Sequence, residues 1–513
     1  MSDTNGTTQN TLPDERTPLI LTNHNSSHHI QNAGVPEPWV DTFVTQLRAQ
    51  DLSNAQSLRA EYSCPESITV ATSRTAFTLI VLMLLHEVLS TPKRKDAFGN
   101  LGERWTQEER DHERLEIVNK EIMDCWNVFL QTEPSTPEVE HVLWISFPLN
   151  QTSQRIRLVD LLASKNVPEE LLTHPVVLLS LTRTWKLGPT AREDSPTVFG
   201  RVSQRMKSLS TPRVLHLLDW LIRTAVLALL IWYIFSPPTV PLEEDANSPS
   251  PGVREILMMV YSFSEICRAK QSSSIAATIV FVSLASRLPS VPLPSDIAFS
   301  GLLIALTLYA LQLHVPAHPS PVFLLPVEEI LPLSTLVQHG MSRIFLPVTT
   351  FFLPSILMFL FLLSMSMSGG LPTIPFLAEY SGASPLETRS AFVFIMVVLL
   401  GIMIFSLIML ILVYPFHSPT NSLSTWDQYS VPIGLDARRA FVRVVIAYSG
   451  RKTFPPPLNL LYLLIAALKA VFRVVGVVRP LVWFDKLQDL LWNVLVLPLA
   501  LVVSGFFCWG LLV

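Results

Sequence analysis

Charged residues inside apolar stretches are the first feature of this sequence that could support chemistry. Asp219 and Arg223 lie four residues apart within the apolar run 214–235, so a helix would place both on one face. Glu265 lies in a weaker apolar stretch, 253–266, and is the candidate for an interior cation or proton site. Because an ionised group in a membrane is costly, we predict either an ion pair between Asp219 and Arg223 or a role in a cation pathway or gating contact.

Two stretches without Asp, Glu, Lys or Arg, 344–378 and 390–426, indicate a membrane protein with a candidate pore. Each stretch exceeds the roughly 20 residues that an apolar helix needs to cross a bilayer. Gly369 and Gly370 could let backbone carbonyls face an ion, and Glu379 could attract cations at a pore mouth. A simple turn after a span and a solvated loop carboxylate are the alternative interpretations of these residues.

A sorting signal is the third candidate site. Glu15, Leu19 and Ile20 fit the acidic dileucine pattern within segment 1–35, which is too polar to bury a core. The pattern favours a vacuolar membrane or another internal membrane, although so short a motif also occurs by chance.

The sequence contains no motif typical of an enzyme, a cofactor site or a metal site. The sequence has no phosphate loop, no dinucleotide-binding glycine pattern, no nucleophile–base–acid set and no metal-ligand spacing. We therefore expect no enzymatic activity, no cofactor and no metal site. The formal net charge of -4 does not favour a nucleic-acid partner.

Composition indicates a multi-spanning membrane protein with a soluble part, because 49% of the residues are hydrophobic and charged residues concentrate before residue 211. In chain order we expect a disordered tail (1–35), a cytosolic helical domain (36–190), a linker (191–212), the first four membrane segments (213–340), a pore-type helix pair (341–416), an interfacial basic helix with a Pro-rich turn (417–456) and C-terminal hydrophobic segments (457–513).

Hydrophobic periodicity predicts the helices of the cytosolic domain. An amphipathic helix is expected over 39–58, and a longer one over 103–131 with an apolar stripe at spacings of three and four. Shorter helices are expected over 158–162, 168–172 and 176–187. The apolar run 76–85 is too short to span a membrane and is interpreted as a buried core helix, with an extra membrane segment as the alternative.

Six membrane spans are predicted near 214–235, 253–266, 274–288, 297–313, 344–366 and 391–414. Lys and Arg flank the first, second and sixth spans on sides that a six-span topology places in the cytosol. The fourth segment lacks Lys and Arg, so we expect no arginine-ladder voltage sensor. A last uncharged segment, 490–513, is also long enough to span a bilayer.

A Pro–Leu–Asn–Leu turn follows the sixth span and its basic helix, at Pro457, Leu458, Asn459 and Leu460. With the order of the preceding parts, it resembles the fungal vacuolar calcium-permeable channels of the transient receptor potential (TRP) type, as a diverged member. The resemblance implies an all-α, six-span TRP-like bundle with an N-terminal cytosolic helical domain and an extra C-terminal hydrophobic segment. It further implies a homotetrameric cation channel, with calcium among its ions and lipids as its surroundings.

The chain departs from this family between the fifth and sixth spans. The interval 364–389 is short for a pore helix followed by a selectivity filter. A non-conducting membrane scaffold or assembly protein, which kept the layout and lost the filter, is therefore the alternative. A secondary transporter is a third interpretation, but the internal repeat expected of one is not visible in the sequence.

Overall fold

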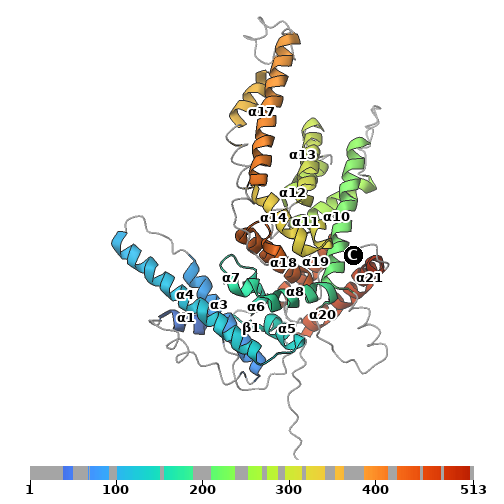
Figure 1. Cartoon of the computed structure of the whole chain (residues 1–513). Helices are drawn as coiled ribbons and strands as arrows, with labels where there is room; N and C mark the ends of the chain where they lie inside the picture. The colour runs from blue at the N-terminus through green and yellow to red at the C-terminus, as the bar shows by residue number, and fades with distance from the viewer. Residues whose placement is uncertain are drawn as a thin grey trace, which may run out of the picture. The chain divides into compact units, whose positions relative to one another are not determined.

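A computed structural model of the chain gives an almost entirely helical protein (Figure 1). The structure describes residues 39–49, 68, 70–91, 101–150, 155–188, 210–236, 252–268, 274–286, 295–314, 319–340, 342, 350, 353–362, 386–413, 424–450, 454–474 and 479–508. These residues fall into two compact units, one formed by Met1–Gln312 with Arg438–Val513 and the other by Leu313–Ala437.

Helix α3 (Ala71–Ser90) is the core helix of the N-terminal part of the first unit. It contacts α1 (Val40–Ala49), α4 (Leu101–Gln131), α5 (Thr136–Trp144) and α6 (Leu158–Leu162). Its apolar run is buried almost throughout, and each large side chain placed there stabilises the fold by about 1.5–3 kcal/mol. This burial agrees with the core role predicted for 76–85, but the 20-residue helix is longer than the predicted run and is long enough to cross a membrane.

Helix α4 carries the apolar stripe that the sequence predicts. Val118, Ile122, Trp126 and Phe129 are all buried, while the charged first half of the helix is largely exposed. The expected helix over 39–58 is described only for α1, and residues 50–58 lie outside the described part. Of the three short helices, α6 has the predicted bounds, and α7 (Glu169–Thr173) and α8 (Pro175–Leu187) lie within one residue of theirs.

A small β-hairpin corrects the expectation of a purely helical domain. Strand β1 (Ser146–Pro148) pairs antiparallel with β2 (Arg155–Arg157), and Phe147 lies opposite Ile156. The Arg155 guanidinium adds a 3.0 Å hydrogen bond to the carbonyl of Ser146. Strands of three residues are too short for an alternating pattern to be recognised in a sequence.

Four helices follow as a bundle: α10 (Pro212–Phe235), α11 (Val253–Arg268), α12 (Ser274–Ala285) and α13 (Ser295–His314). They share a buried cluster in which small residues such as Ala276, Ala277 and Ala305 lie beside larger ones. A Cβ atom on Gly301 of α13 would meet the Ser283 hydroxyl of α12 at 2.5 Å, so the glycine permits a close approach of the two helices. Close packing through small residues is typical of membrane helices.

Helix α11 exposes apolar side chains and buries polar ones, which is the reverse of a helix on the surface of a water-soluble protein. Its large apolar side chains Ile256, Leu257, Val260 and Phe263 are exposed on this chain. Its buried side instead carries polar side chains, listed in chain order: Tyr261, Ser262, Ser264 and Glu265. A hydrocarbon solvent on the outside and a polar bundle interior explain this arrangement, whereas water on the outside does not.

The C-terminal part of the first unit contains α19 (Asn459–Val474), α20 (Arg479–Leu491), the π-helical turn η5 (Trp492–Val496) and α21 (Leu497–Cys508). Lys469 of α19 pairs with Asp485 of α20 at 2.6 Å. Pro498 explains the π-helical turn before it, because proline lacks an N–H and its ring clashes with the carbonyl one turn earlier in an α-helix. Helix α21 packs on α10.

The second unit contains the 3-10 turns η1 (Pro321–Leu324) and η4 (Thr425–Asp427) and the helices α14 (Val327–Gly340) and α17 (Leu386–Val413). Its boundary with the first unit falls within α18 (Val431–Ser449). Helix α14 packs against η1, η4 and α17, and the Gln428 amide donates a 2.8 Å hydrogen bond to the carbonyl of Glu329. The Nε2 atom of His339 lies 2.9 Å from the Asp436 carboxylate.

Three of the described helices are long and apolar enough to cross a membrane: Ala71–Ser90, Pro212–Phe235 and the continuous helix Trp483–Gly505. The first is α3, whose burial is described above. Shorter apolar helices occur at four other predicted spans, namely Ile275–Ala285, Gly301–Ala310, Leu353–Leu362 and Val393–Phe405. The last belongs to α17, whose 28 residues extend about 42 Å.

Candidate functional site

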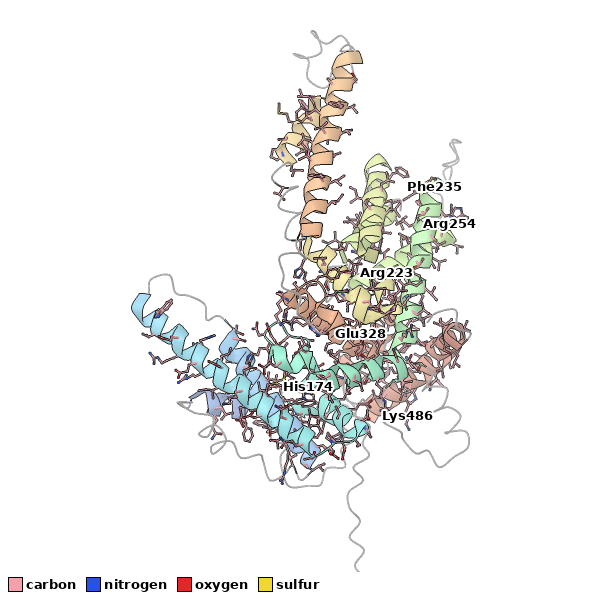
Figure 2. The ribbon with its side chains drawn as sticks, in the orientation of Figure 1. His174, Arg223, Phe235, Arg254, Glu328 and Lys486 are labelled. Atoms are coloured by element: carbon pink, nitrogen blue, oxygen red, sulfur yellow. The ribbon has the colours of Figure 1, made fainter. Side chains whose placement is uncertain are left out.

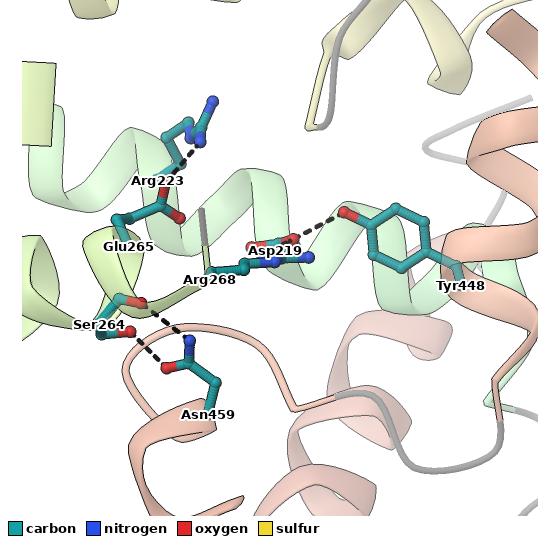
Figure 3. A network of polar contacts seen from close by, with 7 residues as sticks. All are labelled: Asp219, Arg223, Ser264, Glu265, Arg268, Tyr448 and Asn459. Carbon is teal, nitrogen blue, oxygen red and sulfur yellow. Dashed lines mark hydrogen bonds and ion pairs between the residues drawn. The ribbon is translucent and has the colours of Figure 1, made fainter. Parts of the chain in front are cut away.

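Two crossed ion pairs join α10 to α11 near the centre of the candidate site (Figure 3). Arg223 of α10 donates to Glu265 of α11 at 3.0 Å, and Arg268 of α11 donates to Asp219 of α10 at 2.7 Å. The three charges singled out from the sequence, Asp219, Arg223 and Glu265, are almost fully buried, and the two ion pairs run between α10 and α11, whereas the sequence predicted a pair within α10. Residues three and four apart on each helix lie on one face, which brings the four charges together.

The two ion pairs differ in their surroundings. Arg223 and Glu265 are both almost fully buried, whereas the side chain of Arg268 keeps 35% of its surface exposed. Taking a charge out of water is costly, and a buried charge is tolerated only when a partner compensates it. Each charge of the Arg223–Glu265 pair therefore depends more strongly on its partner than the charges of the other pair do. Removing either member would leave an uncompensated charge inside the bundle.

Tyr448 of α18 brings a third helix into the network. Its hydroxyl donates a 2.6 Å hydrogen bond to the Asp219 carboxylate, which also accepts from Arg268 (Figure 3). Burial and the negative charge of Asp219 hold the pKa of the Tyr448 hydroxyl well above its usual range, so the group remains a donor. The Tyr448 ring packs edge-on against His216, which packs in turn against Trp185 of α8.

Asn459, in the Pro–Leu–Asn–Leu turn, joins a fourth helix to α11. Its amide donates a 3.0 Å hydrogen bond to the carbonyl of Ser264 and accepts a second from the Ser264 hydroxyl (Figure 3). The turn also contains a cis peptide bond between Pro456 and Pro457. Pro457, Leu458 and Leu460 are half-buried in this turn. The asparagine thus anchors the start of α19 to α11 at Ser264, one residue before Glu265.

The opposite end of the α10–α11 pair is held by a different set of contacts. The Arg254 guanidinium lies 4.8 Å from the centre of the Trp232 ring and donates to the carbonyl of Ser236. Figure 2 labels Arg254 beside Phe235, the last residue of α10. Glu255 accepts hydrogen bonds from the Tyr233 hydroxyl at 3.0 Å and from the backbone of Gly252. These contacts place Arg254 and Glu255 where the end of α10 meets the start of α11, whereas Glu265 is the buried carboxylate in the interior.

Several predicted site residues lie outside the described part of the chain. These are the pore candidates Gly369, Gly370 and Glu379 and the sorting-signal residues Glu15, Leu19 and Ile20. Within the described part, no group of three or more His, Cys, Asp or Glu side chains is placed to hold a metal ion.

Sequence reasoning missed three members of the network, Tyr448, Ser264 and Arg268. Arg268 was interpreted as a cytosolic flanking charge, although its spacing of three residues from Glu265 signals a shared helix face. Nothing in the local sequence singles out Tyr448, because its partner Asp219 lies 229 residues earlier. No protein-family model matches the chain, and no curated protein matches it.

Proposed function

We propose that the chain is a TRP-like cation channel, with calcium among the conducted ions, in the vacuolar membrane or another internal membrane. The observation that carries the proposal is the attachment of α18 and of the Asn459 turn to the α10–α11 pair. In a six-span channel of this layout, α18 and the Asn459 turn follow the last pore helix. A movement of this segment can affect the first four spans only if contacts connect the two parts.

The inverted polarity of α11 supports embedding in a membrane. Its exposed apolar side chains suit contact with lipid, and its buried charge is compensated by an ion pair. The same argument applies to α17, which exposes Phe394, Val397, Phe405 and other large apolar side chains. Lipid or further copies of the chain would have to cover these surfaces, which agrees with the homotetramer that the resemblance implies.

Single-channel recording tests the proposal directly. The full chain, reconstituted in planar bilayers, is expected to give cation-selective currents under at least one condition of calcium, stretch or pH. Glu379→Gln is expected to lower the cation conductance at low ionic strength, because it removes a charge from the proposed pore mouth. Glu244→Gln removes the same charge from the loop after the first span and should leave the conductance unchanged.

Silent bilayers under all of these conditions would overturn the channel proposal and favour the non-conducting scaffold. Equal conductance in wild type and Glu379→Gln, with currents present, would instead reject the assigned pore residue and keep the channel. Localisation is tested separately with a fluorescent fusion. Leu19→Ala together with Ile20→Ala should move the protein away from its membrane, and unchanged localisation would reject the sorting signal.

A further inference from the structure

A small cavity lies among α10, α11, α12 and α13, next to the Arg223–Glu265 ion pair. It offers about 10 Å³ to a water-sized molecule, enough for about one water. Its polar wall is formed by Arg223, Tyr261, Ser262 and Tyr309. The rest of the wall is apolar and includes Met258, which is fully buried.

Three hydroxyl groups on this wall are buried without a hydrogen-bond partner among the described residues: those of Tyr261, Ser262 and Tyr309. Their residues are only 2%, 1% and 5% exposed. The Tyr261 hydroxyl lies close to the Arg223 guanidinium and the Tyr309 hydroxyl close to that of Ser262, but neither pair has hydrogen-bond geometry. One oxygen of the Glu265 carboxylate is likewise buried without a partner.

Such a cluster is unfavourable as it stands. Burying a polar group without a hydrogen bond destabilises a protein, and most buried hydroxyls in folded proteins have a partner. The three residues belong to two different helices and line one cavity, so a single molecule in it could satisfy more than one of their hydroxyls. Hydroxyl groups both donate and accept, so that molecule must be able to do the same.

The charge of the site restricts the molecule further. The Arg223 guanidinium on the wall repels a cation, and its charge is already compensated by Glu265 at 3.0 Å, so an anion would find no unpaired positive charge there. The site therefore favours a neutral molecule, and its size excludes one much larger than water.

We infer that this cavity is a binding site for an ordered water molecule, which bridges Tyr309 of α13 to Tyr261 and Ser262 of α11. The inference does not depend on the proposed channel function. The water connects α13 to the helix that carries Glu265. It also gives the three hydroxyls a hydrogen-bond partner. Removing two of the three hydroxyls would leave the water too few partners to be held.

X-ray radiolytic footprinting of the full chain in detergent tests this inference, because ordered waters produce hydroxyl radicals beside the residues that they touch. Met258 lines the cavity and is readily oxidised, whereas Met83 is equally buried in the apolar core around α3 and serves as the control. Met258 is expected to be oxidised severalfold faster than Met83. The double variant Tyr261→Phe with Tyr309→Phe should remove this difference.

Tyr233→Phe is the matched control variant, because the Tyr233 hydroxyl binds Glu255 away from the cavity. It should leave the Met258 rate unchanged. Equal oxidation of Met258 and Met83 in the wild-type chain would overturn the inference. So would an organic molecule that native mass spectrometry finds on the wild-type chain and that is lost in the double variant.

Discussion

The Tyr448 hydroxyl donates a 2.6 Å hydrogen bond to the Asp219 carboxylate, across 229 residues of sequence. Asp219 also accepts from Arg268, so one carboxylate holds side chains from α18 and α11 against α10. Because Asn459 holds the start of α19 to Ser264, α11 is tied to two other helices, α10 and α19, within five residues, Ser264 to Arg268. A displacement of α18 would thus reach the bundle through Asp219 of α10, and a displacement of α19 through Ser264 of α11.

Loss of Arg223 is expected to destabilise the protein more than loss of Arg268. Arg223→Gln leaves the Glu265 charge buried without its partner, and breaking a buried pair in this way typically costs about 3–5 kcal/mol. Arg268→Gln should cost less, because Asp219 keeps the hydrogen bond from Tyr448. The apparent melting temperature of the full chain in detergent, followed by tryptophan fluorescence, measures both effects.

The double variant Arg223→Gln with Glu265→Gln provides the control for this comparison. It removes both charges and should recover most of the stability that Arg223→Gln loses, since no uncompensated charge remains. If the single and double variants melt at the same temperature, the ion pair does not contribute in the way that its burial suggests.

Asn459→Ala is expected to cost more than Ser264→Ala. The asparagine change removes both hydrogen bonds between the turn and α11, whereas the serine change keeps the bond to the Ser264 carbonyl. With about 1 kcal/mol for each hydrogen bond, the asparagine variant should lose about twice as much free energy of unfolding. Equal melting temperatures for the two variants would show that the carbonyl bond contributes little.

The sequence predicted the individual helices better than the contacts between them. The apolar stripe of α4 and the bounds of α6 follow from local spacing, which is a property of one helix. Asp219 and Arg223 were recognised because a charge in an apolar run is unusual whatever its partner. Their partners could not be read, because neither spacing nor composition records which helices pack together.

Gly434→Ala is expected to destabilise the second unit. A Cβ atom at Gly434 would overlap the Asp427 side chain and approach the Trp426 carbonyl to 2.8 Å, so η4 would have to move away from the start of α18. Such overpacking typically costs about 1–3 kcal/mol. Gly401→Ala in α17 is the matched control, because nothing lies within 4 Å of its added Cβ atom.

At the Gly401 position, alanine should be neutral or stabilise the helix by about 0.5–1 kcal/mol, since glycine loses more backbone freedom on folding. Hydrogen exchange of the amides in η4 and the first turn of α18 measures the local effect. Exchange that is equally slow in Gly434→Ala and in the wild type would mean that Asp427 moves aside at little cost.

The stability of the N-terminal helical domain is expected to fall in mild acid through His174. Burial lowers the pKa of His174 below its usual value, and its unprotonated Nδ1 accepts a 3.3 Å hydrogen bond from the backbone N–H of Val176 at the start of α8. The unfolded chain therefore binds a proton more readily than the folded chain. The contribution to stability is complete above the unfolded pKa of about 6.5 and decreases as the pH falls below it toward the folded pKa.

His174→Asn separates this effect from other acid-sensitive groups. Asparagine can still accept a hydrogen bond at the N-terminus of α8 but does not titrate, so the variant should lose less stability between about pH 6.5 and pH 5. Melting temperatures of the full chain across this range give the comparison. Because protonated His174 can no longer accept from Val176, the same acidification should speed hydrogen exchange in the first turn of α8 in the wild type relative to the variant. Parallel curves for the two proteins would show that the pKa of His174 is the same in the folded and the unfolded chain, and would contradict the prediction.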